Sequence, residues 1–366
     1  HKSHLVAGGH LTEVPVERVY SGVVSLRSLR TVIFLAQLND LEMYSTDVGN
    51  AYLEAKTTER VYFVAGEGFG ELQGHTLVIY KALYGLRGSG KAYHDVFFDT
   101  LTQMGFQVRK ADNDMWLREK NGLYEYIAVW VDNLAIASKD PHSILKELTD
   151  KYGYKLKGTG PISFHLGCTY GRDPDGTLYA SASRYVEKMA DAFGHMFPGE
   201  KLDKKKTPLA KNDHPELDDS PLLNDAGKSK YLSMVGALHW VIALGRFDVM
   251  SATVTMAKFQ IEPHVSHLHR VKEIYGYLYH TKEAAIRFRI GEPDYSHLPD
   301  TEYDWERTVY GKVEEELPSD ASAPLGKPVV LTTYVDANLY HDLTTGRALT
   351  GILHFINGTL VEWYSK

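Results

Sequence analysis

Two short motifs, each an apolar run that ends in an aspartate, constrain the fold of this chain more than any other feature. The first, LEMYSTDV, predicts a strand over residues 41–47 that carries Asp47 to its end. The second places Asp132 and the residue after it between two β-rich runs, 124–131 and 134–138, and this pattern predicts a tight hairpin with an acidic tip. Carboxylates at the ends of neighbouring strands can hold divalent metal ions between them, as they do in polymerases and nucleases.

Amphipathic helices alternate with these strands. The apolar spacing predicts helices over 25–38, 91–106 and 183–193. In the second of them, the side chains expected on one face are Tyr93, Val96, Phe97, Leu101 and Met104. Because helices and strands interleave without a regular βαβ repeat, the sequence predicts an α+β fold.

Seven segments in a fixed order carry a family resemblance. They are HLVAGG, STDVGNAYL, YKALYGLRGSGKAYHD, VWVDN, YLSMVGALHWV, HLHRVKEIYGYLYHT and the closing stretch from YVDANLYHD to VEWYSK. In this order, and over nearly the whole chain, they resemble the reverse transcriptase of copia-type retrotransposons continuing into a ribonuclease H domain. The resemblance implies fingers, palm and thumb with a mixed palm sheet, followed by a partial ribonuclease H-like sheet. The implied parts are fingers and palm (1–155), remaining palm, thumb and connection (156–290), an acidic linker (291–327) and a truncated ribonuclease H-like domain (328–366).

The expected linker stands out by its composition. Between Gly291 and Asp320 there are ten acidic and two basic residues, and prolines recur without a sustained period. The whole chain has a net charge of −7, of which this segment carries −8, so the rest sums to +1. A nearly neutral remainder neither supports nor excludes binding to nucleic acid.

The resemblance also implies the active-site residues. In such polymerases, carboxylates at the positions of Asp47 and Asp132 bind two Mg²⁺ ions, and the backbone carbonyl of Val48 completes the shell of one ion. Tyr52 stands at the position where an aromatic ring rejects a 2′-hydroxyl on the incoming sugar; the alternative is an aromatic side chain packed at a helix start. The implied partners are an RNA template, a DNA primer and deoxynucleoside triphosphates, and a dimer is an open alternative.

Three departures from the family pattern fall on this site. Asn133 replaces one carboxylate of the family's YVDD box with a neutral amide, which is a weaker Mg²⁺ ligand. Gly88 stands where the family places a glutamine near the nucleotide, and His4 and Gly8 stand where it places Arg and Lys. These changes predict a weakened or inactive polymerase. The alternative is a non-catalytic remnant that at most binds nucleic acid.

The C-terminal part resembles the opening of ribonuclease H. The segment PVVLTTYVDA predicts a strand bearing Asp336, at the position of the first catalytic aspartate of that family. The segment ILHFINGTLVEW predicts a hairpin around Asn357 and Gly358. The other carboxylates of a ribonuclease H belong to later elements, so we expect this chain not to cleave the RNA strand of a hybrid.

Three weaker signals point elsewhere. Residues 85–92, GLRGSGKA, nearly match a phosphate-binding loop, which makes a P-loop ATPase the distant alternative, although Ala92 lacks the hydroxyl that would bind Mg²⁺. The three histidines of EPHVSHLHR have a spacing that suggests zinc, but packing at the surface or at a helix start is the preferred interpretation. The basic cluster 201–206 is interpreted as a solvated loop, with phosphate contact as the alternative.

Composition limits the cellular compartments in which we expect this protein. The single cysteine, Cys168, excludes a disulfide framework and fits a reducing environment. No apolar run approaches the ~20 residues needed to cross a bilayer, and no signal-peptide pattern opens the chain. We therefore expect an intracellular protein, cytoplasmic or nuclear, with no membrane partner. Because the sequence lacks an initial methionine, we also expect it to be a piece of a longer chain.

Overall fold

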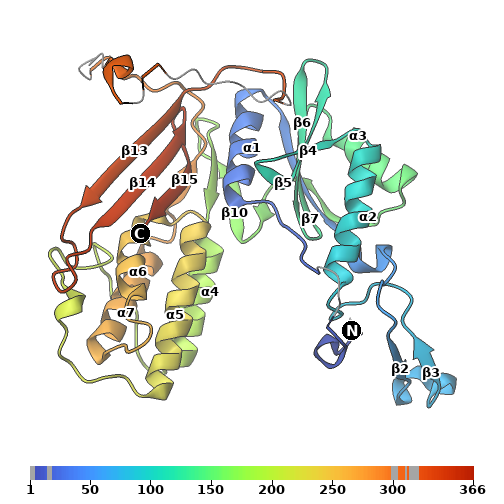
Figure 1. Cartoon of the computed structure of the whole chain (residues 1–366), viewed down its shortest axis with the longest axis horizontal. Helices are drawn as coiled ribbons and strands as arrows, with labels where there is room; N and C mark the ends of the chain where they lie inside the picture. Colours follow the sequence, from blue (N-terminus) through green and yellow to red (C-terminus); the bar gives the residue numbers. More distant parts are fainter. Residues whose placement is uncertain (1–4, 15–18, 298–303, 310, 313–320) are drawn as a thin grey trace.

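The computed structural model describes residues 5–14, 19–297, 304–309, 311–312 and 321–366. Its largest sheet has six strands in the order β4-β5-β6-β7-β1-β8 (Figure 1). The strands are β1 (Glu42–Val48), β4 (Gln107–Arg109), β5 (Asp112–Lys120), β6 (Leu123–Trp130), β7 (Asn133–Ser138) and β8 (Leu156–Pro161). The strands expected around both aspartates are therefore confirmed. The expected mixed sheet is wrong, because every pairing within this sheet is antiparallel. Tight hairpins join β5 to β6 and β6 to β7, and such a hairpin reverses the strand direction.

Helices cover both faces of this sheet. One face is covered by α1 (Leu26–Leu38), and the other by α2 (Ser89–Gln103) and α3 (Pro141–Lys146) (Figure 1). Both helices that the sequence predicts here are confirmed. The first begins directly after Ser25, whose hydroxyl accepts a hydrogen bond from the backbone N–H of Ser28 at 3.1 Å and so caps the helix.

The strand β7 shows how one segment serves both faces. Side chains alternate along a strand, so Ala135 and Ala137 join the core beneath α1 while Leu134 and Ile136 join the core beneath α2 and α3. All four side chains are fully buried. The two alanines leave room for α1 to pack close to the sheet, and the branched residues fill the wider space on the other face.

The sequence pattern wrongly places one residue, Val96, on the buried face of α2. Tyr93, Phe97, Leu101 and Met104 are buried as expected, whereas Val96 is 39% exposed. Successive residues of a helix are ~100° apart, so Val96 falls about 60° outside the arc that the other four share.

A layer of four helices follows the large sheet in the sequence and lies with a second sheet in the order β12-β11-β10-β9. The helices are α4 (Ser183–Met196), α5 (Asp225–Ala243), α6 (Met250–Ala257) and α7 (Val265–His280). The strands are β9 (Phe164–His165), β10 (Cys168–Arg172), β11 (Leu178–Ser181) and β12 (Ala285–Arg287). The expected helix over 183–193 is confirmed as α4. Buried side chains of this layer form one continuous core with those of α1.

The last three strands form an antiparallel sheet in the order β13-β14-β15, with bounds Leu331–Asn338, Leu349–Ile356 and Thr359–Ser365. The hairpin expected around Asn357 and Gly358 is confirmed, and Asn357 has the positive φ of 48° that such a tight turn requires. The strand expected to bear Asp336 is confirmed as β13.

The helix α1 joins this last sheet to the rest of the molecule. The Arg30 guanidinium lies 4.1 Å from the centre of the Trp363 ring on β15 and donates a hydrogen bond to the carbonyl of Ala243, at the end of α5, at 2.9 Å. One turn earlier, Arg27 pairs with Glu362 at 3.1 Å, so residues 335 positions apart in the sequence meet at this helix.

A small antiparallel hairpin of β2 (Tyr62–Val64) and β3 (Thr76–Val78) projects away from the large sheet (Figure 1). Within the described ranges, no helix combines the length and apolar character needed to cross a membrane. Of the expected linker 291–327, residues 298–303, 310 and 313–320 lie outside the described residues, so the linker stays a prediction.

Candidate active site

The two predicted catalytic aspartates lie at the same end of neighbouring strands of the large sheet. Strand β1 pairs with β7 so that Asp47 is directly opposite Asn133. The β6–β7 hairpin turns through Val131 and Asp132 alone, so Asn133, expected in the loop, is instead the first residue of β7. The backbone N–H of Val48 donates to the carbonyl oxygen of Asp132 at 2.8 Å, which fixes the turn against the end of β1.

The turn requires an unusual backbone at Val131, which has a φ of 57°. Two-residue hairpin loops need positive φ and usually contain glycine, asparagine or aspartate there. A β-branched residue in this region is strained, and such strain persists only where the surrounding structure enforces it. It is found here beside Asp132, the residue whose carboxylate is predicted to bind metal.

The carboxylates of Asp47 and Asp132 influence each other. Partial burial and then the negative charge of Asp132 raise the pKa of Asp47, while Lys157, paired with Asp47 on the neighbouring strand β8, opposes that shift. Two like charges held close together disfavour their ionised forms, and a divalent cation between them relieves this repulsion. Lys157 carries no sequence signal for this role, since its position depends on the register between β1 and β8.

These residues fit Mg²⁺ with a reduced set of charged ligands. Across the part of the chain that the structure describes, no group of three or more His, Cys, Asp or Glu side chains is placed to hold a metal ion. Mg²⁺ is nevertheless often bound by only one or two carboxylates together with water and substrate phosphates. The side-chain amide of Asn133 donates to Oδ1 of Asp132 at 3.1 Å, so Asn133 stabilises that carboxylate instead of supplying a third one.

Three tyrosines pack together within reach of the charge of Asp132. Tyr52, in a 3-10 turn over Ala51–Glu54, lies 4.6 Å from Tyr84 and 6.1 Å from Tyr93, measured between ring centres. Burial and then the charge of Asp132 raise the pKa of both Tyr52 and Tyr84, so both hydroxyls lie in the field of that carboxylate. The hydroxyl of Tyr93 is buried without a hydrogen-bond partner among the described residues. The sequence assigned Tyr93 only to the core and did not single out Tyr84.

The described part of the HLVAGG segment, residues 5–9, lies against the segment LYGL, residues 83–86. The N–H of Ala7 donates to the carbonyl of Tyr84 at 2.7 Å, and Gly9 packs so closely on Gly85 that an added Cβ would be 2.0 Å from its carbonyl oxygen. Gly8 belongs to this described segment, whereas His4 lies outside the described residues. Gly88 directly precedes α2 as its N-cap residue, and its N–H donates to Oε1 of Glu59 at 2.7 Å.

The phosphate-loop alternative loses its structural basis. A P-loop follows a strand of a parallel sheet, whereas β3 pairs only with β2, and antiparallel, in the described structure. Lys91, the lysine of the near-match, lies on α2 and forms an ion pair with Asp95 one turn further on.

The histidine cluster is a helix start, as the sequence interpretation preferred. His264 precedes α7, its backbone N–H donates to Nδ1 of His267 at 3.1 Å, and Nε2 of His267 lies 2.9 Å from the carbonyl oxygen of Pro215. His269 is exposed on the same helix. In the basic cluster 201–206, Lys205 pairs with Glu273 at 2.7 Å.

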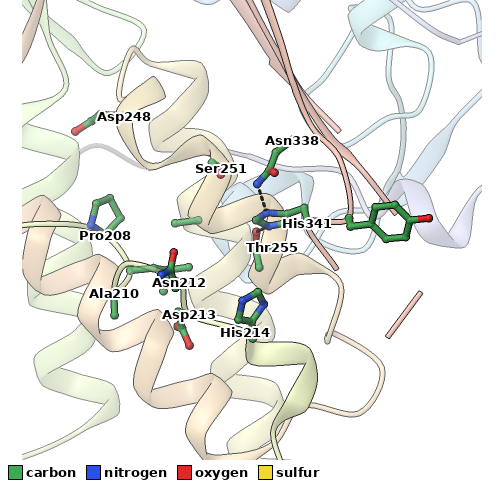
Figure 2. Close-up of a pocket in the computed structure, with 13 residues that line it drawn as sticks. Pro208, Ala210, Asn212, Asp213, His214, Asp248, Ser251, Thr255, Asn338 and His341 are labelled. Carbon is green, nitrogen blue, oxygen red and sulfur yellow. Dashed lines mark hydrogen bonds between the residues drawn. The ribbon is translucent and has the colours of Figure 1, made fainter. Parts of the chain in front are cut away.

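A pocket of about 420 Å³ lies away from the aspartates, between α6 and the connection from β13 to β14 (Figure 2). Figure 2 shows Asp213 and Asp248 on its wall, together with His214 and His341. Both carboxylates are neutralised by arginines, Asp213 by Arg270 at 2.8 Å and Asp248 by Arg246 at 2.7 Å. Asp336 is exposed on β13, outside this wall.

Comparisons with known proteins agree with the sequence motifs. The family model of the reverse transcriptase (RNA-dependent DNA polymerase) matches residues 1–200. The chain is 24% identical to the retrovirus-related Pol polyprotein from transposon TNT 1-94 of Nicotiana tabacum, over all of this chain and 25% of that polyprotein. It is 26% identical to the retrovirus-related Pol polyprotein from transposon RE1 of Arabidopsis thaliana, over 80% of this chain and 20% of that polyprotein. It is 28% identical to a transposon Ty5-1 protein of Saccharomyces cerevisiae, over 67% of this chain and 79% of that protein.

The chain thus spans a quarter or less of the two Pol polyproteins that it matches. The family model covers more than half of the 366 residues, and the resemblance seen in the motifs is confirmed for the reverse transcriptase part. The chain belongs to the reverse transcriptase family of copia-type retrotransposons.

Proposed function

We propose that this chain is the RNA-directed DNA polymerase part of a retrotransposon polyprotein and that its activity is weakened. The observation that carries the proposal is the pairing of β1 with the β6–β7 hairpin. This pairing brings Asp47 and Asp132 to the same end of neighbouring strands. Its substrates are then an RNA template, a DNA primer and deoxynucleoside triphosphates.

Each residue of the proposed polymerase site has a separate role. When bound, two Mg²⁺ ions lower the pKa of the primer 3′-hydroxyl and neutralise the triphosphate. Asp47 and Asp132 hold them, with the backbone carbonyl of Val48 as a further ligand. Tyr52, beside Asp132, lies beneath the sugar and excludes a 2′-hydroxyl, and Tyr84 packs against its ring.

The weakening follows from two positions. Asn133 removes one negative charge from the edge where Asp47 and Asp132 meet, and it donates to Asp132. Gly88 presents no side chain to a nucleotide, and Glu59 contacts its backbone instead. Metal and nucleotide are therefore both held less tightly than three carboxylates and a glutamine would hold them.

The parts of the chain fit this proposal in order. Residues 1–155 supply most of the large sheet as fingers and palm, and 156–290 supply β8 and the helical layer as the remaining palm, thumb and connection. Residues 291–327 are the linker. Residues 328–366 form the antiparallel sheet β13-β14-β15, which we propose to be the opening of a ribonuclease H-like domain with Asp336 as its first carboxylate.

A primer-extension assay on an RNA template tests the proposal. The 366-residue chain should extend the primer slowly in Mg²⁺, and Asp47→Ala or Asp132→Ala should abolish the product. Asp191→Ala, which removes an exposed carboxylate on α4, is the matched control and should leave extension unchanged. If template–primer binds and is never extended, even after Asn133→Asp, the chain is the non-catalytic binder and the polymerase proposal is wrong.

A further inference from the structure

The carboxylate of Glu59 occupies the place where α2 begins. The N–H of Gly88 donates to Oε1 of Glu59 at 2.7 Å, although the two residues are 29 positions apart. Glu59 is half-buried in the connection between the Tyr52 turn and β2. The connection itself is held in place, because the N–H of Glu59 donates to Oγ1 of Thr57 at 3.1 Å and the N–H of Thr57 donates to the carbonyl of Tyr80 at 3.1 Å.

The same carboxylate fills the space of a side chain at position 88. A Cβ added to Gly88 would lie 2.8 Å from Oε1 of Glu59 and 3.6 Å from Oγ1 of Thr58. Real Cβ atoms do not approach oxygen this closely, so a larger residue at position 88 requires Glu59 to move. Because Oε1 is the far end of a flexible side chain, Glu59 can swing aside, so a side chain at position 88 displaces this carboxylate from the N–H of Gly88.

Glu59 also lies close to the proposed nucleotide site. Gly88 follows Tyr84 by four residues, and Tyr84 packs on Tyr52 at 4.6 Å beside Asp132. A nucleotide whose sugar lies over Tyr52 and whose phosphates reach toward α2 therefore meets the negative charge of Glu59. A triphosphate is itself strongly negative, so this charge opposes its binding.

We propose that Glu59 sets the affinity for nucleoside triphosphates: it stands in place of a side chain at position 88 and repels the phosphates until it leaves Gly88. This inference rests on the proposed polymerase function. It makes Glu59 a residue that determines nucleotide affinity, distinct from the carboxylates predicted to bind metal, and it predicts that positions 59 and 88 act as a pair.

Nucleotide affinity tests the charge. The dissociation constant of a deoxynucleoside triphosphate is measured in Mg²⁺ on the full chain with template and a primer that lacks its 3′-hydroxyl, so that binding is read without turnover. Glu59→Gln keeps an oxygen that can accept from Gly88 but removes the charge, and it should tighten binding by about two- to fivefold, the range that one partly exposed charge contributes. The gain should shrink as salt is added. Glu67→Gln, an exposed glutamate near the β2–β3 hairpin, is the control and should change nothing.

A stability cycle tests the pairing without any nucleotide. Gly88→Gln should lower the melting temperature slightly in the parent chain, where it displaces the carboxylate of Glu59 from the N–H of Gly88, and by less in a Glu59→Ala background, where that hydrogen bond is already absent. Equal losses in both backgrounds, or equal nucleotide affinity of Glu59→Gln and parent, overturn the inference and leave the polymerase proposal intact. Absence of nucleotide binding in every variant, Asn133→Asp included, overturns the polymerase proposal and the inference with it.

Discussion

Asp47 faces Asn133 directly across the ladder between β1 and β7, so a carboxylate meets an amide at the edge where the aspartates gather. Residues opposite each other in an antiparallel pair have their Cβ atoms ~5 Å apart, close enough for one charge to alter the other's ionisation. The identity of residue 133 therefore affects both the stability of the free chain and its affinity for cations.

Asn133→Asp should make the metal-free chain less stable and bind Mg²⁺ more tightly. Like charges directly opposite each other destabilise a sheet, here by about 0.2–1 kcal/mol. Added Mg²⁺ should then raise the melting temperature more than it does for the parent, because stabilisation by a ligand grows with the logarithm of its concentration divided by its dissociation constant. Thermal denaturation in EDTA and across a Mg²⁺ titration measures both effects. The swap Asp47→Asn with Asn133→Asp keeps the charge count and should return the metal-free stability close to that of the parent.

Asp47→Asn should stabilise the metal-free chain at neutral pH and abolish cation binding. The pKa of Asp47 is raised in the folded chain by burial and by Asp132, so its protonated form is favoured by folding. The corresponding stability is present below the ordinary aspartate pKa and is lost as the pH rises through the raised value. Because Asp47 is only partly shielded and its side chain still reaches solvent, the gain from the substitution should be at most about 1 kcal/mol. Denaturant unfolding in EDTA at pH 4 and pH 7 should show the variant's advantage only at the higher pH.

The ion pair between His94 and Asp114 should make stability fall at alkaline pH. Nε2 of His94 lies 2.8 Å from Oδ1 of the buried Asp114, and this hydrogen bond raises the pKa of His94, with Asp95 adding to the shift and Lys91 opposing it. The stability from the charged pair is fully present below pH ~6.5 and is lost as the pH rises through the raised pKa. Unfolding free energies at pH 6 and pH 9 should differ for the parent and much less for Asp114→Asn. His75→Gln, an exposed histidine outside this pair, should keep the parent's pH dependence.

Tyr52→Val should admit ribonucleotides. The ring proposed to lie under the sugar is removed, so the ratio of kcat/KM for deoxyribonucleotides over ribonucleotides should fall about tenfold or more. Tyr84→Ala should lower it less, since Tyr84 acts on the proposed sugar position through its packing against Tyr52. Single-nucleotide extension with matched dNTP and NTP measures the ratio. Tyr62→Val, at an exposed ring on β2, is the control. An unchanged ratio in Tyr52→Val would return Tyr52 to the simpler interpretation, an aromatic side chain packed at a turn.

Long, strongly patterned elements of this fold were predictable from the sequence. α1 has a capping serine and an apolar stripe, and β6 and β7 are β-rich runs around a polar tip, so local chemistry and tertiary packing favour the same structure. The turn residues were not predictable, because no local rule places Val131 at a positive φ; the pairing of Trp130 with Asn133 leaves a two-residue loop that requires it.

The surroundings of the site depend on pairings between distant segments. Lys157 reaches Asp47 only through the register of β8 on β1, and Glu59 reaches Gly88 across a folded connection. Neither contact has a periodic or motif-like trace in the sequence. The family resemblance identified the residues that are proposed to carry the chemistry. The charged residues around them could be identified only from the structure.

The contacts of Arg30 affect the cooperativity of unfolding. One guanidinium touches Trp363 of the last strand and the end of α5, while the helix that carries it covers the sheet with both aspartates. A chain whose first helix and last strand are tied together in this way should lose its structure in a single cooperative transition. In variants that keep Trp363 or Trp130 as the single tryptophan of the five in the chain, fluorescence should therefore report the same midpoint at both positions, and Arg30→Ala should separate the two.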